Sequence, residues 1–143
     1  MRRKLFPILF VAIVCLLSII SIAKYIPRSL PNLLSLNSSR ILWVDFRYQN
    51  GSQNYLEIND QDTLKEFSDI ICNTKLIFVE ENSIIPVRKL YSIHVGDTSE
   101  NLYSFMSSDR YVYINNRCYR VMGYNQLYEF LDALWNRDGL AVE

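Results

Sequence analysis

The clearest pattern in the chain is an apolar run, Leu5–Ala23, that contains no charged residue and directly follows three cations, Arg2, Arg3 and Lys4. As a helix with a rise of ~1.5 Å per residue, this run would be roughly 28 Å long, close to the ~30 Å hydrocarbon core of a bilayer. Segments rich in Lys and Arg stay on the cytoplasmic side of a membrane. Residues 1–24 are therefore predicted to be a single-pass signal-anchor at the cell membrane, with a cytoplasmic N-terminus and an extracytoplasmic body.

Two alternatives to a retained anchor stay open. Ser21-Ile22-Ala23 places small residues where a signal peptidase cleaves, and cleavage after Ala23 would release a secreted body. Against this, the run is longer than the ~7–15 apolar residues usual in a signal peptide. A lipidated Cys15 is disfavoured, because bacterial lipoprotein signals carry a small residue before the cysteine and here it is Val14.

The next stretch, residues 25–40, is predicted to be a juxtamembrane linker. Pro27 and Pro31 fix the backbone there, and Ser and Asn residues interrupt any periodic apolar pattern. Lys24, Tyr25 and Arg28 would lie at the outer membrane interface, where amphipathic side chains favour the headgroup layer.

Residues 41–48 alternate between apolar and polar positions, which predicts a half-buried strand. Leu42, Val44 and Phe46 fall on its inner face; Trp43, Asp45 and Arg47 fall on its outer face.

Asn50-Gly51 predicts a hairpin that returns through residues 55–58. A two-residue loop would pair Phe46 with Tyr55 and separate the apolar faces. A three-residue loop pairs Val44 with Leu56 and Leu42 with Ile58, so burial favours it.

The remaining pattern predicts two helices and five further strands. Apolar residues at helical spacing favour a helix over residues 62–72, capped by Asn59-Asp60, and a closing helix capped near Asn125. Asn115-Asn116 is typical of a tight turn that needs positive φ. The inner face of one strand stays open between Tyr103/Phe105 and Leu102/Met106. The strands are predicted at residues 75–79, 90–95, 101–106, 110–114 and 117–121.

The predicted order is β-β-α-β-β-β-β-β-α. Because both helices have an apolar stripe and each strand has one apolar face, the expected fold is α+β. It is a two-layer sandwich in which an antiparallel sheet carries both helices on one face. The domain would span residues 41–137 and leave a tail at 138–143.

Charge is distributed unevenly along the chain, although the formal net charge is +0. The five charged residues up to Arg28 are all basic, whereas every acid lies from Asp45 onward. The rest of the chain has ten bases against fifteen acids, a net charge of −5. A body of that sign is not expected to bind nucleic acid, because phosphates need a cationic surface.

The outer face of the predicted sheet is rich in aromatic residues, which dominate the hot spots of protein interfaces. Cross-strand aromatic pairs can also simply stabilise a sheet. The candidate binding residues are Trp43, Tyr55, Tyr111 and Tyr113.

Catalytic chemistry has little support in the sequence. His94 is the single histidine, and the chain shows no zinc-ligand spacing and no glycine-rich phosphate loop. Asp45 and Glu57 share a face and could act as paired carboxylates, but acids on the wet face of a sheet are far more common. Cys72 and Cys118 are predicted to face opposite sides, which disfavours a disulfide. No catalytic residue, cofactor or metal is expected.

From Ile41 to about Trp135 the chain resembles small membrane-anchored or lipoprotein-type bacterial extracytoplasmic domains of unknown function. The resemblance lies in the opening strand with Asn50-Gly51, the INDQDTLKEF helix entry, the YSIHVGD strand and the YVYINNRCY hairpin. It implies the location and the fold, and it carries no site residues. The expected function is a non-enzymatic module that binds a protein or another envelope component. An inhibitor or self-protection protein, or a small hydrolase, is the alternative.

Overall fold

The computed structural model describes residues 5–23, 25–49, 55–79 and 89–138, and the side chains of α1 (Leu5–Ala23) from Leu9 onward. Within these residues the fold is α+β with one antiparallel sheet, as predicted, but the sheet has eight strands rather than seven, because β1 joins it. The strands are β1 (Arg28–Ser29), β2 (Ile41–Tyr48), β3 (Leu56–Ile58), β4 (Lys75–Val79), β5 (Tyr91–Asp97), β6 (Leu102–Ser107), β7 (Tyr111–Ile114) and β8 (Arg117–Val121).

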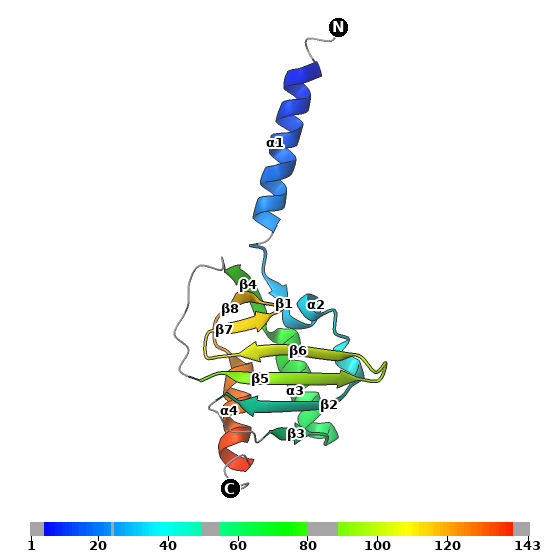
Figure 1. Ribbon diagram of the computed structural model, residues 1–143, viewed down its shortest axis with the longest axis vertical. Helices are drawn as coiled ribbons and strands as arrows, with labels where there is room; N and C mark the ends of the chain where they lie inside the picture. The colour runs from blue at the N-terminus through cyan, green and yellow to red at the C-terminus, as the bar shows by residue number, and fades with distance from the viewer. Residues whose placement is uncertain (1–4, 24, 50–54, 80–88, 139–143) are drawn as a thin grey trace.

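The strand order across the sheet is β1-β4-β8-β7-β6-β5-β2-β3. Figure 1 shows α1 next to the β1–β4 edge, with the strands stacked one after another away from it and β3 at the far edge. From β2 onward, the order of elements matches the predicted β-β-α-β-β-β-β-β-α.

The β2–β3 pair has the predicted faces but not the predicted register. Val44 pairs with Ile58 and Phe46 with Leu56, so the predicted pairing of Val44 with Leu56 and Leu42 with Ile58 is wrong. The Asn50-Gly51 turn itself lies outside the described residues. The two-residue shift keeps all four apolar side chains on one face because side chains alternate with a period of two.

Leu42 is the exception to the predicted inner face of β2. The pairing of β2 with β5 shifts between Ile41 and Trp43, which is a β-bulge. The bulge turns Leu42 outward, where 52% of it is exposed, and Ile41 instead packs against the core.

The β5–β8 meander follows the sequence pattern closely. Asn115 and Asn116 both have positive φ in the turn between β7 and β8, as predicted. Phe105 is buried and Tyr103 packs against the core, which settles the inner face of β6.

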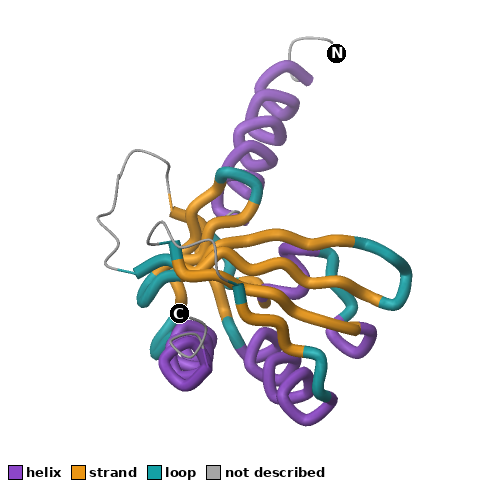
Figure 2. The backbone as a smooth tube through the Cα atoms, turned by 60° about the horizontal axis from the view of Figure 1, so that its bottom comes forward, coloured by secondary structure: helices purple, strands orange, loops and turns teal. Residues whose placement is uncertain are grey.

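Both long helices begin at the predicted caps. Asp60 accepts a hydrogen bond from the Thr63 amide at the start of α3 (Gln61–Asn73), and Asn125 accepts one from the Tyr128 amide at the start of α4 (Gln126–Asp138). Figure 2 shows the two helices on the same side of the sheet. The core lies between these layers.

Aromatic rings link the helices to the sheet and to each other. Trp135 of α4 contacts Phe46 and Tyr91 with ring centroids 6.3 and 6.4 Å apart, and Phe67 of α3 contacts Phe130 of α4 at 6.3 Å.

The segment predicted as a linker contributes to the packed domain. Ser29 lies in β1, which pairs with β4, and the Leu30 amide donates to the Thr74 carbonyl at 3.1 Å. Leu30 and Leu36 are buried in the core. They lie in and after α2 (Leu30–Leu34), which is followed by the short 3₁₀ helix η2 (Ser38–Arg40). The packed part of the chain therefore begins at Arg28, not at Ile41.

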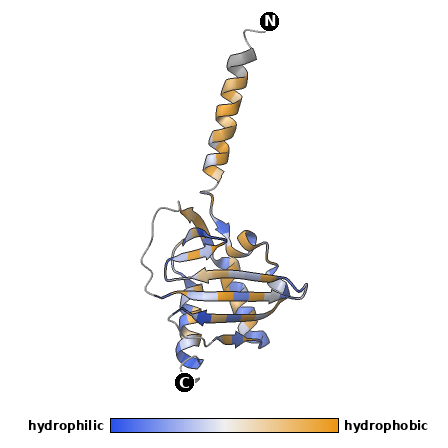
Figure 3. Ribbon diagram, in the orientation of Figure 1, coloured by the Kyte–Doolittle hydropathy of each residue, from blue (hydrophilic) through white to orange (hydrophobic). Residues whose placement is uncertain are grey.

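Helix α1 projects away from the domain (Figure 1) and is apolar along the length that Figure 3 colours. Its large side chains are exposed, from Leu9 at 60% to Ile22 at 65%. In the described part of the chain, no helix combines the length and hydropathy of a membrane span.

Candidate binding face

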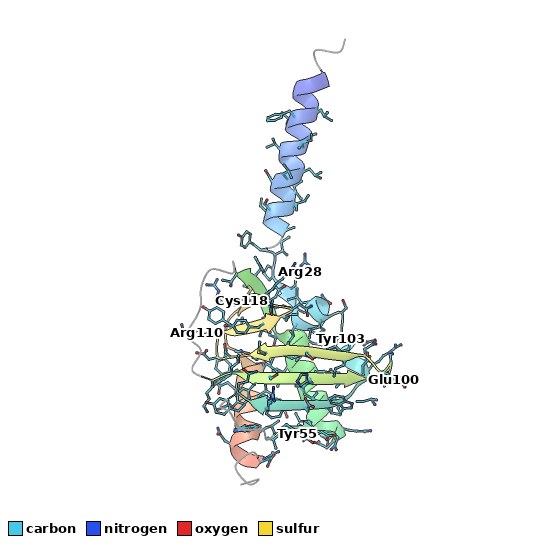
Figure 4. All side chains as sticks on the ribbon, in the orientation of Figure 1. Arg28, Tyr55, Glu100, Tyr103, Arg110 and Cys118 are labelled. Carbon is cyan, nitrogen blue, oxygen red and sulfur yellow. The ribbon has the colours of Figure 1, made fainter. Side chains whose placement is uncertain are left out.

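The side of the sheet opposite α3 and α4 is called the open face here. Because side chains alternate along a strand, the residues between the buried core positions point to this side. Cys118 of β8, one of these residues, is labelled in Figure 4. The open-face residues include Trp43, Asp45, Arg47, Glu57, Ser92, His94, Ser104, Met106, Tyr111, Tyr113, Cys118 and Arg120.

The register of the sheet aligns four polar residues across four strands. Glu57 pairs with Asp45, Asp45 with His94, and His94 with Ser104. We call these four residues the polar row. Asp45 and Glu57, which the sequence placed on one face, are therefore directly opposite each other.

Two features of the polar row are electrostatic. His94 Nδ1 and Ser104 Oγ are hydrogen-bonded at 2.8 Å. The pKa of Asp45 lies above its usual value, chiefly because burial penalises the charged carboxylate. The neighbouring His94 lowers this pKa, and the Glu57 carboxylate raises it. Two like charges in direct cross-strand pairing destabilise a sheet.

The Trp43 indole packs closely against the open face because residue 96 is a glycine. Trp43 pairs with Gly96 across the β2–β5 bulge, and its indole lies on the Gly96 backbone. A Cβ atom at residue 96 would overlap the indole ring. Gly96 therefore allows a close approach that no other residue would permit, and Trp43 is pre-positioned next to the polar row.

The four aromatic residues predicted as one surface fall into two groups. Trp43 is in β2, and Tyr55, 63% exposed, directly precedes β3. Tyr111 and Tyr113 are in β7, which is separated from β2 by β6 and β5. Strands are ~4.8 Å apart, so the two groups are about 14 Å from each other.

The β7 group is built around Tyr113, Cys118 and Met106. Tyr113 pairs with Cys118 on one side and with Met106 on the other. Burial raises the pKa of the Tyr113 hydroxyl and also that of the Cys118 thiol. A thiol with a raised pKa is a poor nucleophile at neutral pH. Cys118 is in β8 and His94 is in β5, and strands β7 and β6 lie between them. These two residues are therefore too far apart to form a nucleophile–base pair.

Ser104, His94 and Asp45 have the residue types of a nucleophile, a base and an orienting acid, respectively. Sequence reasoning missed Ser104, which only the strand register brings next to His94. Among the described residues, however, no hydrogen bond joins Asp45 to His94, so the orienting contact is missing. Nor does any group of three or more His, Cys, Asp or Glu side chains in these ranges converge to hold a metal ion.

The cysteines of the body are both free. Cys72, at the end of α3, is a hydrogen-bond neighbour of Ser38 Oγ at 3.1 Å, while Cys118 is on the open face. They lie on opposite sides of the sheet, as the sequence indicated.

Comparison with known protein families, with characterised proteins and with solved structures finds no match for this chain.

Proposed function

We propose that the protein is a membrane-anchored, extracytoplasmic and non-enzymatic module that binds another protein through its open face. The centre of the contact is the β2–β3 part of that face, with Trp43, Asp45, Tyr55 and Glu57. The partner presents a cationic segment, rich in Lys or Arg, to the two carboxylates. A peptide or protein of that chemistry fits both the charge and the aromatic surface.

One observation carries this proposal: two directly opposed carboxylates, Asp45 and Glu57, lie on a sheet face that neither α3 nor α4 covers. In the free protein their repulsion costs about 0.2–1 kcal/mol. A partner cation placed between them would remove that cost and gain two charge-assisted contacts. The adjacent indole of Trp43 is already fixed, so it loses little entropy on binding and suits an interface hot spot.

The anchor part of the proposal rests on residues 1–24. Three cations precede the uncharged apolar run, and cations of that kind stay in the cytoplasm. A helix that is apolar on all sides needs an apolar environment. The exposed side chains of α1 find none in the domain. A secreted form, cleaved after Ala23, is the alternative for localisation, and the apparent mass of the protein in isolated membranes distinguishes the two.

The binding face is tested by site-specific photocrosslinking in intact membranes. A photoreactive amino acid replaces Tyr55 in one full-length variant and Tyr124 in a control. Both tyrosines are exposed, but Tyr124 precedes α4 and lies beside Glu129 of that helix. We expect a discrete crosslinked product from position 55 and not from position 124.

Three further substitutions are combined with the probe at position 55. Trp43→Ala and Glu57→Lys should each reduce the product about tenfold, and the product should weaken as salt is raised. Lys65→Glu, on the exposed side of α3, should not change it. If the product survives Trp43→Ala and Glu57→Lys in folded protein, the open face is not the binding surface.

The hydrolase alternative is kept because His94 and Ser104 are hydrogen-bonded. A fluorophosphonate probe labels activated serines, so the full chain is incubated with it and compared with Ser104→Ala. We expect no labelling in either protein. Labelling of the wild type that Ser104→Ala abolishes would make the protein an enzyme.

A further inference from the structure

The base of α1 and the nearest end of the domain enclose an amphipathic recess. One lobe has a volume of about 670 Å³ and an apolar wall that includes Ile20, Ile26, Leu33 and Phe78. A second lobe of about 410 Å³ is lined by Asn32 and Asn115. Arg28 and Arg117 line both lobes, so the two are continuous. Figure 4 shows Arg28 directly below α1.

The two arginines are available to an anion. Neither guanidinium forms an ion pair with any other described residue. Arg28 and Arg117 come from β1 and β8, on two sides of the intervening strand β4. A guanidinium presents a planar fork of donors that matches a phosphate group.

The strands next to the recess carry charge of the opposite sign to that of the body. All four charged residues of the three strands nearest α1 are basic: Arg28 in β1, Lys75 in β4, and Arg117 and Arg120 in β8. Strands β2 and β3, at the far end, carry two acids, Asp45 and Glu57, against one base, Arg47, and are net acidic. This polarity places a cationic end next to the apolar helix and an anionic end away from it.

We propose that the recess binds one anionic phospholipid of the membrane in which α1 is embedded. The lipid phosphate lies between Arg28 and Arg117 and accepts further hydrogen bonds from the side-chain amides of Asn32 and Asn115. The first part of an acyl chain lies against Ile26, Leu33 and Phe78. The position of the recess at the bilayer surface rests on the proposed anchor. Charge complementarity and the apolar lobe select a phospholipid over a soluble phosphate.

Lipid retention is measured by native mass spectrometry of the full chain, released from nanodiscs of stated composition. Nanodiscs of phosphatidylcholine with phosphatidylglycerol should yield protein that retains one phosphatidylglycerol, and nanodiscs of phosphatidylcholine alone should yield lipid-free protein. The double variant Arg28→Gln/Arg117→Gln should retain about tenfold less phosphatidylglycerol than the wild type, or less still. Arg40→Gln/Arg110→Gln removes the same charge elsewhere on the exposed surface and should retain the lipid.

Two additional arms identify the ligand. Inorganic phosphate at millimolar concentration should not displace the lipid, and Phe78→Ala should weaken retention while leaving the charge unchanged. Displacement by phosphate would show an anion site and overturn the lipid assignment. Equal retention by the two double variants would overturn the site itself.

The result is separable from the proposed function. If the chain is cleaved after Ala23, its mass in membranes reports the loss of the anchor before any lipid is measured. If the chain is intact but the Arg28/Arg117 variant retains lipid, only the lipid inference fails. The Arg28/Arg117 variant should keep the photocrosslink from position 55, because β3 is at the opposite edge of the sheet from β1.

Discussion

The hydroxyl of Tyr91 donates a 2.6 Å hydrogen bond to Oδ1 of Asp132, which ties strand β5 to helix α4. The Lys89 ammonium donates to the same oxygen at 2.8 Å, and the Asn136 amide donates to Oδ2 at 3.1 Å. The Tyr91 ring is fully buried. The hydrogen bond therefore joins the two layers, and its donor, Tyr91, is shielded from water.

Replacement of Tyr91 by Phe removes this bond and keeps the ring. Because the acceptor is charged, the free energy of unfolding should fall by about 1.5–3 kcal/mol. Urea denaturation followed by circular dichroism measures the change. Tyr124→Phe, at a residue 71% exposed, is the control and should change stability by less than about 0.5 kcal/mol. Equal effects would show that the Tyr91–Asp132 bond does not stabilise the domain.

The same site predicts a response to acid. Burial by itself would raise the pKa of Asp132, but hydrogen bonds from Lys89 and Tyr91 outweigh it and hold this pKa below its usual value. A carboxyl with a lowered pKa stabilises the fold above its unfolded-state pKa, and this stabilisation is lost as pH falls through its folded-state pKa. Stability should therefore fall below about pH 4, and Asp132→Asn should flatten that dependence. An unchanged acid slope in Asp132→Asn would contradict the assignment.

Asp45 should behave with the opposite sign. Its pKa is raised in the folded protein, so its contribution to stability is greatest below its unfolded-state pKa and is lost as pH rises through its folded-state pKa. At pH 7, Asp45→Asn should raise the free energy of unfolding by about 0.5 kcal/mol, because it removes a partly buried charge and, secondarily, its repulsion from Glu57. The gain should disappear in urea titrations at pH 4. A loss of stability at pH 7 would instead mark Asp45 as a purely structural residue.

The contact of Trp43 with Gly96 can be measured as a coupling free energy in a double-mutant cycle. Gly96→Ala forces the indole aside and should cost about 1–3 kcal/mol of unfolding free energy. In a Trp43→Ala background the same substitution meets no ring, so it should cost much less. The double-mutant cycle gives the coupling free energy directly, and additive effects would show that the two residues do not interact.

The contribution of residues 28–40 to the domain gives a further prediction. Leu30 is fully buried, so Leu30→Ala should lower the free energy of unfolding by about 2–4 kcal/mol. Leu42→Ala, at the exposed bulge position of β2, is the matched control and should cost less than about 1 kcal/mol. If the two costs were equal, residues 28–40 would be acting only as a tether.

Alternation and capping chemistry were sufficient to predict most elements from β2 onward. Val44 and Phe46 are apolar at every second position, and Asp60 and Asn125 precede amphipathic stretches, so local physics specifies these faces and helix starts. The register of β2 with β3 was not predictable, since a shift of two residues leaves the same apolar faces buried. The bulge that exposes Leu42 lies beside the contact between Trp43 and Gly96, which are far apart in the sequence.

The missed elements are short. A two-residue strand at Arg28–Ser29 and a five-residue helix containing Pro31 leave no periodic signal, and the pairing of the strand with β4 is set by tertiary contacts. The polar row was missed for a related reason. Ser104 is a small polar residue on a wet face, and only the pairing of β5 with β6 brings it next to His94.

The orientation of the sheet relative to α1 determines how far the Asp45–Glu57 pair lies from the membrane surface. The strands are stacked away from α1, and β2 is six strand spacings from β1 in the sheet order. At ~4.8 Å per spacing, the Asp45–Glu57 pair is held roughly 25–30 Å above the bilayer surface when the chain is anchored as proposed. A partner that lies flat on the lipid headgroups would pass beneath this pair. The partner must extend outward from the membrane by about the same distance. It therefore needs sufficient length as well as positive charge to bind this face.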